Sequence, residues 1–288
     1  MASVGFVIHH ERSEAAELAK GAAVWLLDRG HDVRFLPDDA ARLGFAEQAC
    51  SPAELPVALD LAVSLGGDGT MLRTVDLVSG DGVAVMGVNL GQLGYLTEVE
   101  PGQLLVALKR FLAGSFEIEE RMRLAVSLET AAGPGTPAAT GLPGLNEAVI
   151  EKTPVGHTVR LAVEIDGDFF TTYAADGLIV ATPTGSTAYA FSARGPIVSP
   201  HHRALVLTPV SPHMLFDRTL VLDPTSTVRI EVLGDRPAAV AVDGRAVGVL
   251  RDGDAIVCRE AIEPARLVTF APGSFLRILK AKFGLNDR

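Results

Sequence analysis

The feature that most constrains this chain is Gly66-Gly67-Asp68-Gly69-Thr70, which follows a mostly aliphatic run over residues 57–65. An aliphatic run that stops at paired glycines and continues as Met71-Leu72-Arg73-Thr74-Val75 is typical of a strand, a tight turn and a helix. Glycines allow backbone N–H groups to approach an anion, and a helix start adds the positive end of its dipole. The pattern predicts a phosphate-handling turn with a built-in acid, Asp68. An ordinary turn with an aspartate cap explains GGDG alone equally well.

Composition limits the classes of protein to consider. The 288 residues are 48% apolar and 21% charged, which indicates a folded globular chain of one large domain or two ordinary ones. A net charge of −10 argues against nucleic acid as a partner, since such proteins usually carry a basic face. We see no secretory leader and no plausible membrane span, and Cys50 and Cys258 have no metal-ligand spacing. We therefore expect a cytoplasmic protein with free thiols and no membrane partner.

The first part of the chain alternates predicted strands and helices. Strands are expected at 4–9, 33–36, 57–65 and 83–88, and helices at 13–28, after residue 70 and at 103–112. This βαβ pattern predicts an α/β domain with a parallel sheet flanked by helices. Ligands of such sheets gather at the carboxyl ends of the strands, where the GGDGT turn falls. The glycine-punctuated loop at 89–96 is expected to pack beside that turn.

From residue 116 onward, strand-like alternation replaces helical spacing. Short strands at 123–128, 159–165 and 227–232, with Asp-Gly turn signals between strands, predict a mainly β domain. We expect an α/β domain over 1–115, a mainly β domain over 116–271, and a C-terminal helix within 272–288 that packs back on the first. Residues 131–143 are expected to form a loose excursion.

Two polar segments of the second part are candidates for ligand binding. Asn146-Glu147 precedes an apolar strand; such pairs usually solvate a sheet edge, but an amide and a carboxylate can also contact a base and ribose hydroxyls. The stretch 175–198 delivers a buried strand into a hydroxyl-rich turn broken by Gly185. Its hydroxyls offer donors and acceptors, and Tyr189 offers a flat face for an adenine ring. Helix capping is the simpler explanation, but four small hydroxyl residues around one glycine make capping alone insufficient.

The motifs together resemble a known family. GGDGT, the Asn146-Glu147 pair, DGLIVATPTGSTAY from Asp176 and TPVSPH from Thr208 occur in this order, and the set resembles the bacterial NAD kinase family. GGDGT alone is shared with diacylglycerol-type lipid kinases and phosphofructokinases, whereas TPTGSTAY is far more restrictive. The resemblance implies an N-terminal α/β domain, a C-terminal β domain and a site between them.

The resemblance also implies an activity. It is the phosphorylation of the 2′-hydroxyl of the adenosine ribose of NAD to give NADP, with ATP or polyphosphate as donor. A divalent metal, Mg²⁺ above all, is implied without assigned ligands, as are homodimers or homotetramers whose neighbouring subunit completes the pocket. Two alternatives stay open: a lipid kinase, which would need an apolar cleft, and a sensor that binds NAD or NADP without catalysis.

The resemblance assigns roles residue by residue. Asp68 matches the proton acceptor. The positions matching donor or dinucleotide contacts are Gly66, Gly67, Asp68, Gly69, Thr70, Arg73, Asn146, Glu147, His157, Asp176, Thr187, Ala188, Tyr189, Ala190, Phe191, Ser192 and Arg245.

The chain departs from the family pattern at two arginines. The family commonly has a glycine where this chain has Arg194, and often a glutamine where it has Arg245. Each arginine can contact a phosphate or pair with an acidic surface residue.

Overall fold

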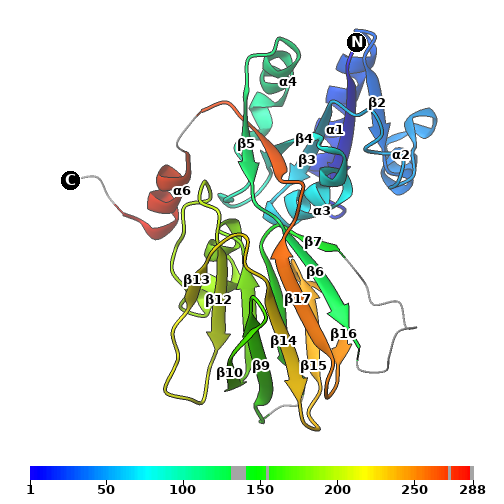
Figure 1. The fold of residues 1–288 in the computed structure, drawn as a ribbon. Helices are drawn as coiled ribbons and strands as arrows, with labels where there is room; N and C mark the ends of the chain where they lie inside the picture. The colour runs from blue at the N-terminus through cyan, green and yellow to red at the C-terminus, as the bar shows by residue number, and fades with distance from the viewer. Residues whose placement is uncertain (131–140, 154–155, 272–273, 286–288) are drawn as a thin grey trace. The chain divides into compact units, whose positions relative to one another are not determined.

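The computed structural model describes residues 1–130, 141–153, 156–271 and 274–285. Most of the predicted excursion at 131–143, and part of the predicted 272–288 segment, lie outside these residues. The chain divides into two compact units, residues 1–120 with 264–288 and residues 121–263 (Figure 1). No helix among the described residues is both long and apolar enough to cross a membrane.

The first unit is an α/β unit. Its elements are β1 (Ser3–Ile8), α1 (Ser13–Leu27), β2 (Asp32–Phe35), α2 (Pro37–Leu43), η1 (Ala46–Gln48), β3 (Leu61–Gly66), α3 (Asp68–Val78), η2 (Ser79–Asp81), β4 (Ala84–Asn89), η3 (Pro101–Gln103), α4 (Leu104–Leu112), β5 (Glu117–Arg121), β18 (Ala265–Thr269) and α6 (Ser274–Phe283). The sheet order is β2-β1-β3-β4-β18-β5. Each adjacent pair from β2 to β18 in this order is parallel. The predicted parallel sheet is confirmed.

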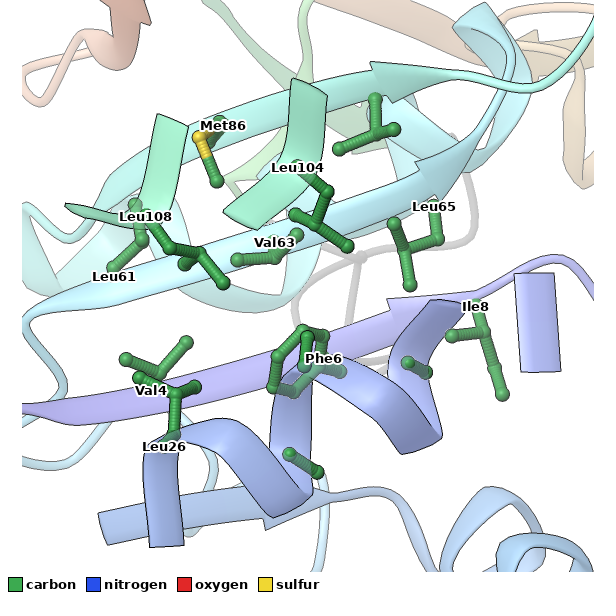
Figure 2. Close-up of a cluster of buried hydrophobic side chains, with 14 of the residues drawn as sticks. Val4, Phe6, Ile8, Leu26, Leu61, Val63, Leu65, Met86, Leu104 and Leu108 are labelled. Carbon is green, nitrogen blue, oxygen red and sulfur yellow. The ribbon is translucent and has the colours of Figure 1, made fainter. Parts of the chain in front are cut away.

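Helices cover both faces of this sheet. Figure 2 shows Phe6 of β1 and Val63 of β3 in a cluster with Leu26 of α1 and Leu108 of α4, all buried. On the opposite face, Met71 of α3 packs on the sheet, with its sulfur 3.1 Å from the position of a Cβ on Gly87. Strands buried on both faces explain why β1, β3 and β4 are continuous apolar runs.

Two predicted boundaries in the first unit were wrong. The strand expected at 57–65 begins only at Leu61, because Ala58 has a left-handed backbone with φ 53° and Val57 is 58% exposed. At the first helix, Ser13 is the first helical residue instead of the N-cap, a position that Arg12 occupies without a side-chain cap.

The second unit consists of antiparallel sheets. Its elements are β6 (Leu124–Glu129), β7 (Leu142–Gly144), β8 (Glu147–Lys152), β9 (Val159–Ile165), β10 (Asp168–Ala175), β11 (Gly177–Ala181), η4 (Thr184–Thr187), α5 (Tyr189–Ser192), β12 (Leu205–Val210), β13 (Leu220–Leu222), β14 (Val228–Leu233), β15 (Ala238–Val242), β16 (Arg245–Leu250) and β17 (Ala255–Glu260). Two six-stranded sheets, β10-β9-β14-β17-β6-β7 and β13-β12-β11-β8-β15-β16, share one apolar core. The predicted mainly β fold class is confirmed as a sandwich.

The chain returns to the first unit earlier than residue 272, where we expected it. Residue 264 begins the return, because β18 pairs in parallel with β4 through Arg266 and Leu267. Local alternation cannot show which sheet a strand joins, since its partner lies about 180 residues earlier in the chain.

We predict that Phe6→Ala lowers the free energy of unfolding by about 3–5 kcal/mol, the usual cost of removing a fully buried aromatic ring. Phe6 is fully buried and stacks on Phe35 with ring centroids 5.3 Å apart. The measurement is urea-induced unfolding followed by circular dichroism. Phe169, which is 66% exposed, supplies the control, and Phe169→Ala is expected to change stability by less than about 1 kcal/mol. Equal losses for both variants would contradict the packing described here.

Candidate functional site

Asp68 is held rigidly at the carboxyl end of β3, as the first helical residue of α3. Its Oδ2 accepts the backbone N–H of Tyr95 at 2.9 Å, and its Oδ1 accepts that of Leu96 at 3.0 Å. The expected packing of the 89–96 loop beside the GGDGT turn is therefore confirmed. The helix dipole also favours a carboxylate at this end of α3. Each oxygen keeps a further lone pair for a ligand.

The three glycines of the turn differ in the space around them. A Cβ on Gly66 would lie 2.1 Å from the Thr70 hydroxyl, so close packing inside the turn requires this glycine. A Cβ on Gly67 or Gly69 would meet nothing within 4 Å, and both residues line a pocket. Gly67 and Gly69 are thus the positions at which a ligand can approach the backbone.

That pocket, about 440 Å³ in volume, collects basic side chains in an acidic chain. Arg12, Arg73, His9 and His10 line it together with the single carboxylate of Glu11. Nη1 of Arg73 lies 2.5 Å from Nε2 of His10. Because a guanidinium only donates, the contact requires His10 Nε2 to accept.

Arg42 and Asp39 of α2 contribute to this pocket through His10, one of its lining residues. Arg42 donates to the carbonyl of His10 at 2.7 Å and to Oδ1 of Asp39 at 3.3 Å. Burial raises the pKa of Asp39, an effect that Arg42, His10 and Arg73 partly offset. Sequence reasoning missed this support, since α2 lies about 30 residues before the turn and carries no motif.

Helix α6 contacts the same loop that holds Asp68. Phe275 lies near the Tyr95 ring with centroids 6.4 Å apart, and Nζ of Lys282 sits 4.1 Å from the ring centre. Burial, and then the Asp68 charge, raise the pKa of Tyr95. The C-terminal helix therefore helps to position the loop whose N–H groups hold the carboxylate.

In the second unit, Asp243 organises the Asn-Glu pair. Its Oδ2 accepts the N–H of Leu145 at 2.7 Å, and its Oδ1 accepts those of Asn146 at 2.8 Å and Glu147 at 3.1 Å. The backbone of Asp243 is left-handed, with φ 48°, in the turn between β15 and β16. Sequence reasoning used Asp243 only as a turn signal; the clamp depends on a partner about 100 residues away.

The TPTGSTAY segment packs directly on this pair. A Cβ on Gly185 would lie 2.1 Å from the carbonyl oxygen of Asn146, and Thr182 donates its hydroxyl to Leu145 O at 2.6 Å. The hydroxyls of this segment make internal hydrogen bonds. Thr184 accepts from Arg121, the Ser186 hydroxyl bonds to Pro183 and Val198, and Thr187 donates to Thr184 O. These hydroxyls build the turn, because their buried backbone neighbours need partners.

Glu147 is a buried acid with spare hydrogen-bonding capacity. It is 7% exposed, it accepts the backbone N–H of Tyr189, and its Oε2 has no partner in the described structure. Burial, and then the neighbouring Asp243, raise the pKa of Glu147 to about 7. A buried carboxyl oxygen without a partner is a place where a ligand hydroxyl would be stabilised.

Tyr189, Phe191 and Ser192 of α5 are exposed, whereas Ala190 is buried and Thr187 and Ala188 are half-buried. Burial, Glu151 and Asp176, in that order, raise the pKa of Tyr189. Asp176 also pairs with Lys152, with Nζ and Oδ1 2.5 Å apart. Asp176, Glu147 and Tyr189 thus belong to one region of the second unit.

Two predicted positions, His157 and Arg245, are exposed. His157 is exposed in a loop before β9, and no described contact joins it to another predicted site residue. Arg245 is exposed at the start of β16; it donates to Pro143 O at 3.4 Å and lowers the pKa of Asp243, whose net shift is upward through burial.

The donor set of the described residues fits a metal ion that the substrate helps to hold. The described residues contain no group of three or more His, Cys, Asp or Glu side chains suited to hold a metal. Mg²⁺, however, is commonly bound by one or two carboxylates, substrate phosphates and water. Asp68, between the pocket-lining Gly67 and Gly69, and Glu11, which itself lines the pocket, are carboxylates that would contribute to such a sphere.

The first unit has an acidic glycine turn at the carboxyl end of β3, with a basic pocket lined by residues of that turn, and the second unit has a polar cluster. These features suit phosphorylated ligands. Residues 4–116 match the family model for the ATP-NAD kinase N-terminal domain, and residues 145–270 match that for the ATP-NAD kinase C-terminal domain. The chain belongs to the NAD kinase family.

Curated relatives and solved structures agree with this family. NAD kinase of Heliobacterium modesticaldum is 41% identical over 287 residues, covering 98% of each chain, and NAD kinase of Syntrophotalea carbinolica is 36% identical over 289 residues, covering 100% of each. Yeast NADH kinase complexed with NADH superposes with a TM-score of 0.90 at 25% identity, covering 100% of this chain and 89% of that one. An NAD kinase from Archaeoglobus fulgidus in complex with ATP gives 0.73 at 26% identity, covering 99% of each.

We predict that Gly185→Ala destabilises the protein by about 1–3 kcal/mol, because the new methyl group collides with backbone and no rotamer can relieve it. Gly21 is the control: it lies within α1, and a Cβ there meets nothing within 4 Å. Gly21→Ala is expected to raise stability by about 0.5–1 kcal/mol. Denaturant unfolding of both variants gives the comparison, and a neutral Gly185→Ala would refute the close approach to Asn146.

The raised pKa of Glu147 predicts a pH-dependent stability. The folded protein retains this proton up to about pH 7, whereas an unfolded glutamate loses it near pH 4.5. The stabilisation is therefore fully present below about pH 4.5 and is lost as pH rises to about 7, by up to about 3 kcal/mol. Glu147→Gln should match the wild type at pH 4 and exceed its stability at pH 8. A wild-type-minus-variant difference that is the same at both pH values would contradict this prediction.

Proposed function

We propose that this chain phosphorylates the 2′-hydroxyl of the adenosine ribose of NAD to give NADP, with ATP or polyphosphate as donor. The observation that carries the proposal is the Asp68 carboxylate, which two loop N–H groups hold and which lies in the chain between Gly67 and Gly69, two residues that line a basic pocket. Membership of the NAD kinase family and the likeness to structures complexed with NADH and with ATP support the choice of substrates.

Donor phosphates are held by the first unit. Gly67 and Gly69 lie open at the start of α3, and Thr70 and Arg73 line the same pocket, with Arg12 adding a second guanidinium. Gly66 shapes the turn through its contact with Thr70. Phosphoryl transfer passes through a loose transition state, so alignment and neutralisation of charge matter more than covalent chemistry. A Mg²⁺ ion bound by the donor phosphates and Asp68 would supply further charge neutralisation.

Asp68 accepts the proton of the attacking hydroxyl. Its two backbone hydrogen bonds fix the carboxylate orientation while leaving lone pairs for the substrate. A base that is oriented before the substrate arrives needs no reorganisation during the reaction. In a loose transition state the proton leaves late, so this step contributes less than alignment does.

The dinucleotide is recognised by the polar cluster of the second unit. Asn146 and the buried Glu147 bind ribose or base groups, and Tyr189 stacks on an aromatic ring. Thr187, Ala188, Ala190, Phe191 and Ser192 shape the surrounding surface. His157, Asp176 and Arg245 complete the proposed set of dinucleotide contacts. A ligand lacking the matching hydroxyls leaves the Glu147 oxygen unpaired, which favours a dinucleotide over a lipid.

We further propose a homodimer or homotetramer. Its support is an apolar surface on β8, β15 and β16, where Val149, Ala239, Ala241, Val247 and Val249 line one pocket and Val249 is 55% exposed. Light scattering after size-exclusion chromatography gives the oligomer size. A cytoplasmic setting agrees with the free thiols of Cys50 and Cys258.

We predict that Asp68→Asn lowers kcat by about 10²-fold or more, since a positioned base is lost. Asparagine offers one acceptor in place of two, so one loop N–H loses its partner at a cost of about 1–3 kcal/mol in stability. A coupled assay of NADP formation measures kcat, and thermal unfolding in parallel measures stability. Asp76→Asn, on the same helix, is the control for a lost carboxylate and should leave kcat within a few-fold of the wild type.

The same assay separates the alternatives. Near-normal turnover in Asp68→Asn would remove Asp68 from its role as base. A wild type that binds NAD without forming NADP would be a sensor, and phosphorylation of diacylglycerol in place of NAD would indicate a lipid kinase.

A further inference from the structure

Asp39 of α2 is a buried acid that the proposed chemistry does not use. Its side chain belongs to a residue that is 1% exposed, and its Oδ2 has no hydrogen-bond partner among the described residues. Most buried polar atoms are paired, and a carboxylate with an unpaired oxygen is costly to bury. The basic groups that act on its charge are Arg42, His10 and Arg73. A contribution to stability alone does not explain an acid at this position.

Arg42 connects Asp39 to the basic pocket. Its guanidinium donates from Nη2 to Oδ1 of Asp39 at 3.3 Å and from Nη1 to the carbonyl oxygen of His10 at 2.7 Å. The planar fork of a guanidinium allows both bonds at once. Asp39 therefore fixes Arg42, and Arg42 fixes the backbone of His10, a residue that lines the pocket.

His10 in turn contacts Arg73 of α3, which lines the same pocket. Nη1 of Arg73 donates to Nε2 of the ring, with the two atoms 2.5 Å apart. A guanidinium carries five N–H groups, so this bond leaves others for an anion. A long side chain that is already oriented loses less conformational freedom when a ligand binds.

We propose that Asp39 is a positioning residue for anion binding in this pocket. By holding Arg42 on the His10 carbonyl, it sets the His10 ring against Arg73 and orients that guanidinium for a phosphate chain. Asp39 is not among the residues that line the pocket, so it acts through the others. The inference rests on the proposed function in one respect, because the phosphate chain is taken to be that of the phosphoryl donor.

Charge and position predict opposite effects of Asp39→Asn on the affinity for tripolyphosphate. Removing a negative charge close to Arg42 and Arg73 would, by charge alone, tighten the binding of an anion. Loss of the ion pair with Arg42 should instead weaken the binding about 2- to 10-fold, the range for one long side chain that the ligand must order.

Arg42→Lys separates the same two effects from the other partner. Lysine keeps the positive charge but lacks the fork that reaches both Asp39 and His10. Positioning predicts a similar loss of affinity in this variant, whereas charge alone predicts none.

Calorimetric titration of the full chain with tripolyphosphate and Mg²⁺, at fixed pH and ionic strength, measures these affinities. Asp38→Asn is the matched control, since the neighbouring Asp38 is exposed and its loss changes the net charge equally; it should not weaken binding. Tighter or unchanged binding by Asp39→Asn, or unchanged binding by Arg42→Lys, would overturn the proposal. Thermal unfolding checks the fold, and the partly exposed Arg42 decides the question if Asp39→Asn does not fold.

The kinetics of NADP formation provide a second readout. Asp39→Asn and Arg42→Lys should raise KM for the donor by the same factor as the dissociation constant, with KM for NAD and kcat within about 2-fold of the wild type. An equal rise of both KM values would indicate a general structural defect and would contradict a positioning role.

The titration needs no turnover. A wild type that forms no NADP, yet binds tripolyphosphate in a way that depends on Asp39 and Arg42, would refute the kinase proposal and leave this one standing. Normal NADP formation with undiminished tripolyphosphate binding in both variants would do the reverse.

Discussion

The structure of the candidate site depends on carboxylates that accept backbone N–H groups from distant parts of the chain. Asp243 holds Leu145, Asn146 and Glu147 in place, and Asp68 holds Tyr95 and Leu96. A carboxylate accepts several such bonds at once, and charge-assisted bonds are stronger than neutral ones. Each unit therefore uses the same device to fix a loop that no regular secondary structure would hold.

The two carboxylates nevertheless do different work. Asp68 is half-buried and accepts two loop N–H groups, and its neighbours Gly67 and Gly69 line a pocket. Asp243 accepts three backbone N–H groups, and its charge adds to burial in raising the pKa of Glu147. Asp68 belongs to the proposed chemistry, whereas Asp243 positions Asn146 and Glu147.

The distribution of charge explains how an acidic chain can handle polyanions. The chain carries a net charge of −10, yet arginines line a pocket in each unit. Local guanidinium groups and backbone amides within a few ångströms outweigh distant surface charges, which salt screens. The proposed donor-phosphate contacts in the first unit follow from this local concentration of cations.

The sequence by itself determined the two fold classes and the strand, turn and helix around residues 66–70, because periodicity and glycine patterns are local signals. Only the tertiary structure decided that Thr184 and Ser186 bond internally, that β18 joins the first unit, and that Asp243 clamps residues 145–147. Apart from the Ser186 bond to Pro183 O, these contacts join residues that are between 12 and about 180 positions apart in the chain. Such pairings arise from the packing of whole sheets, which no short stretch of sequence specifies.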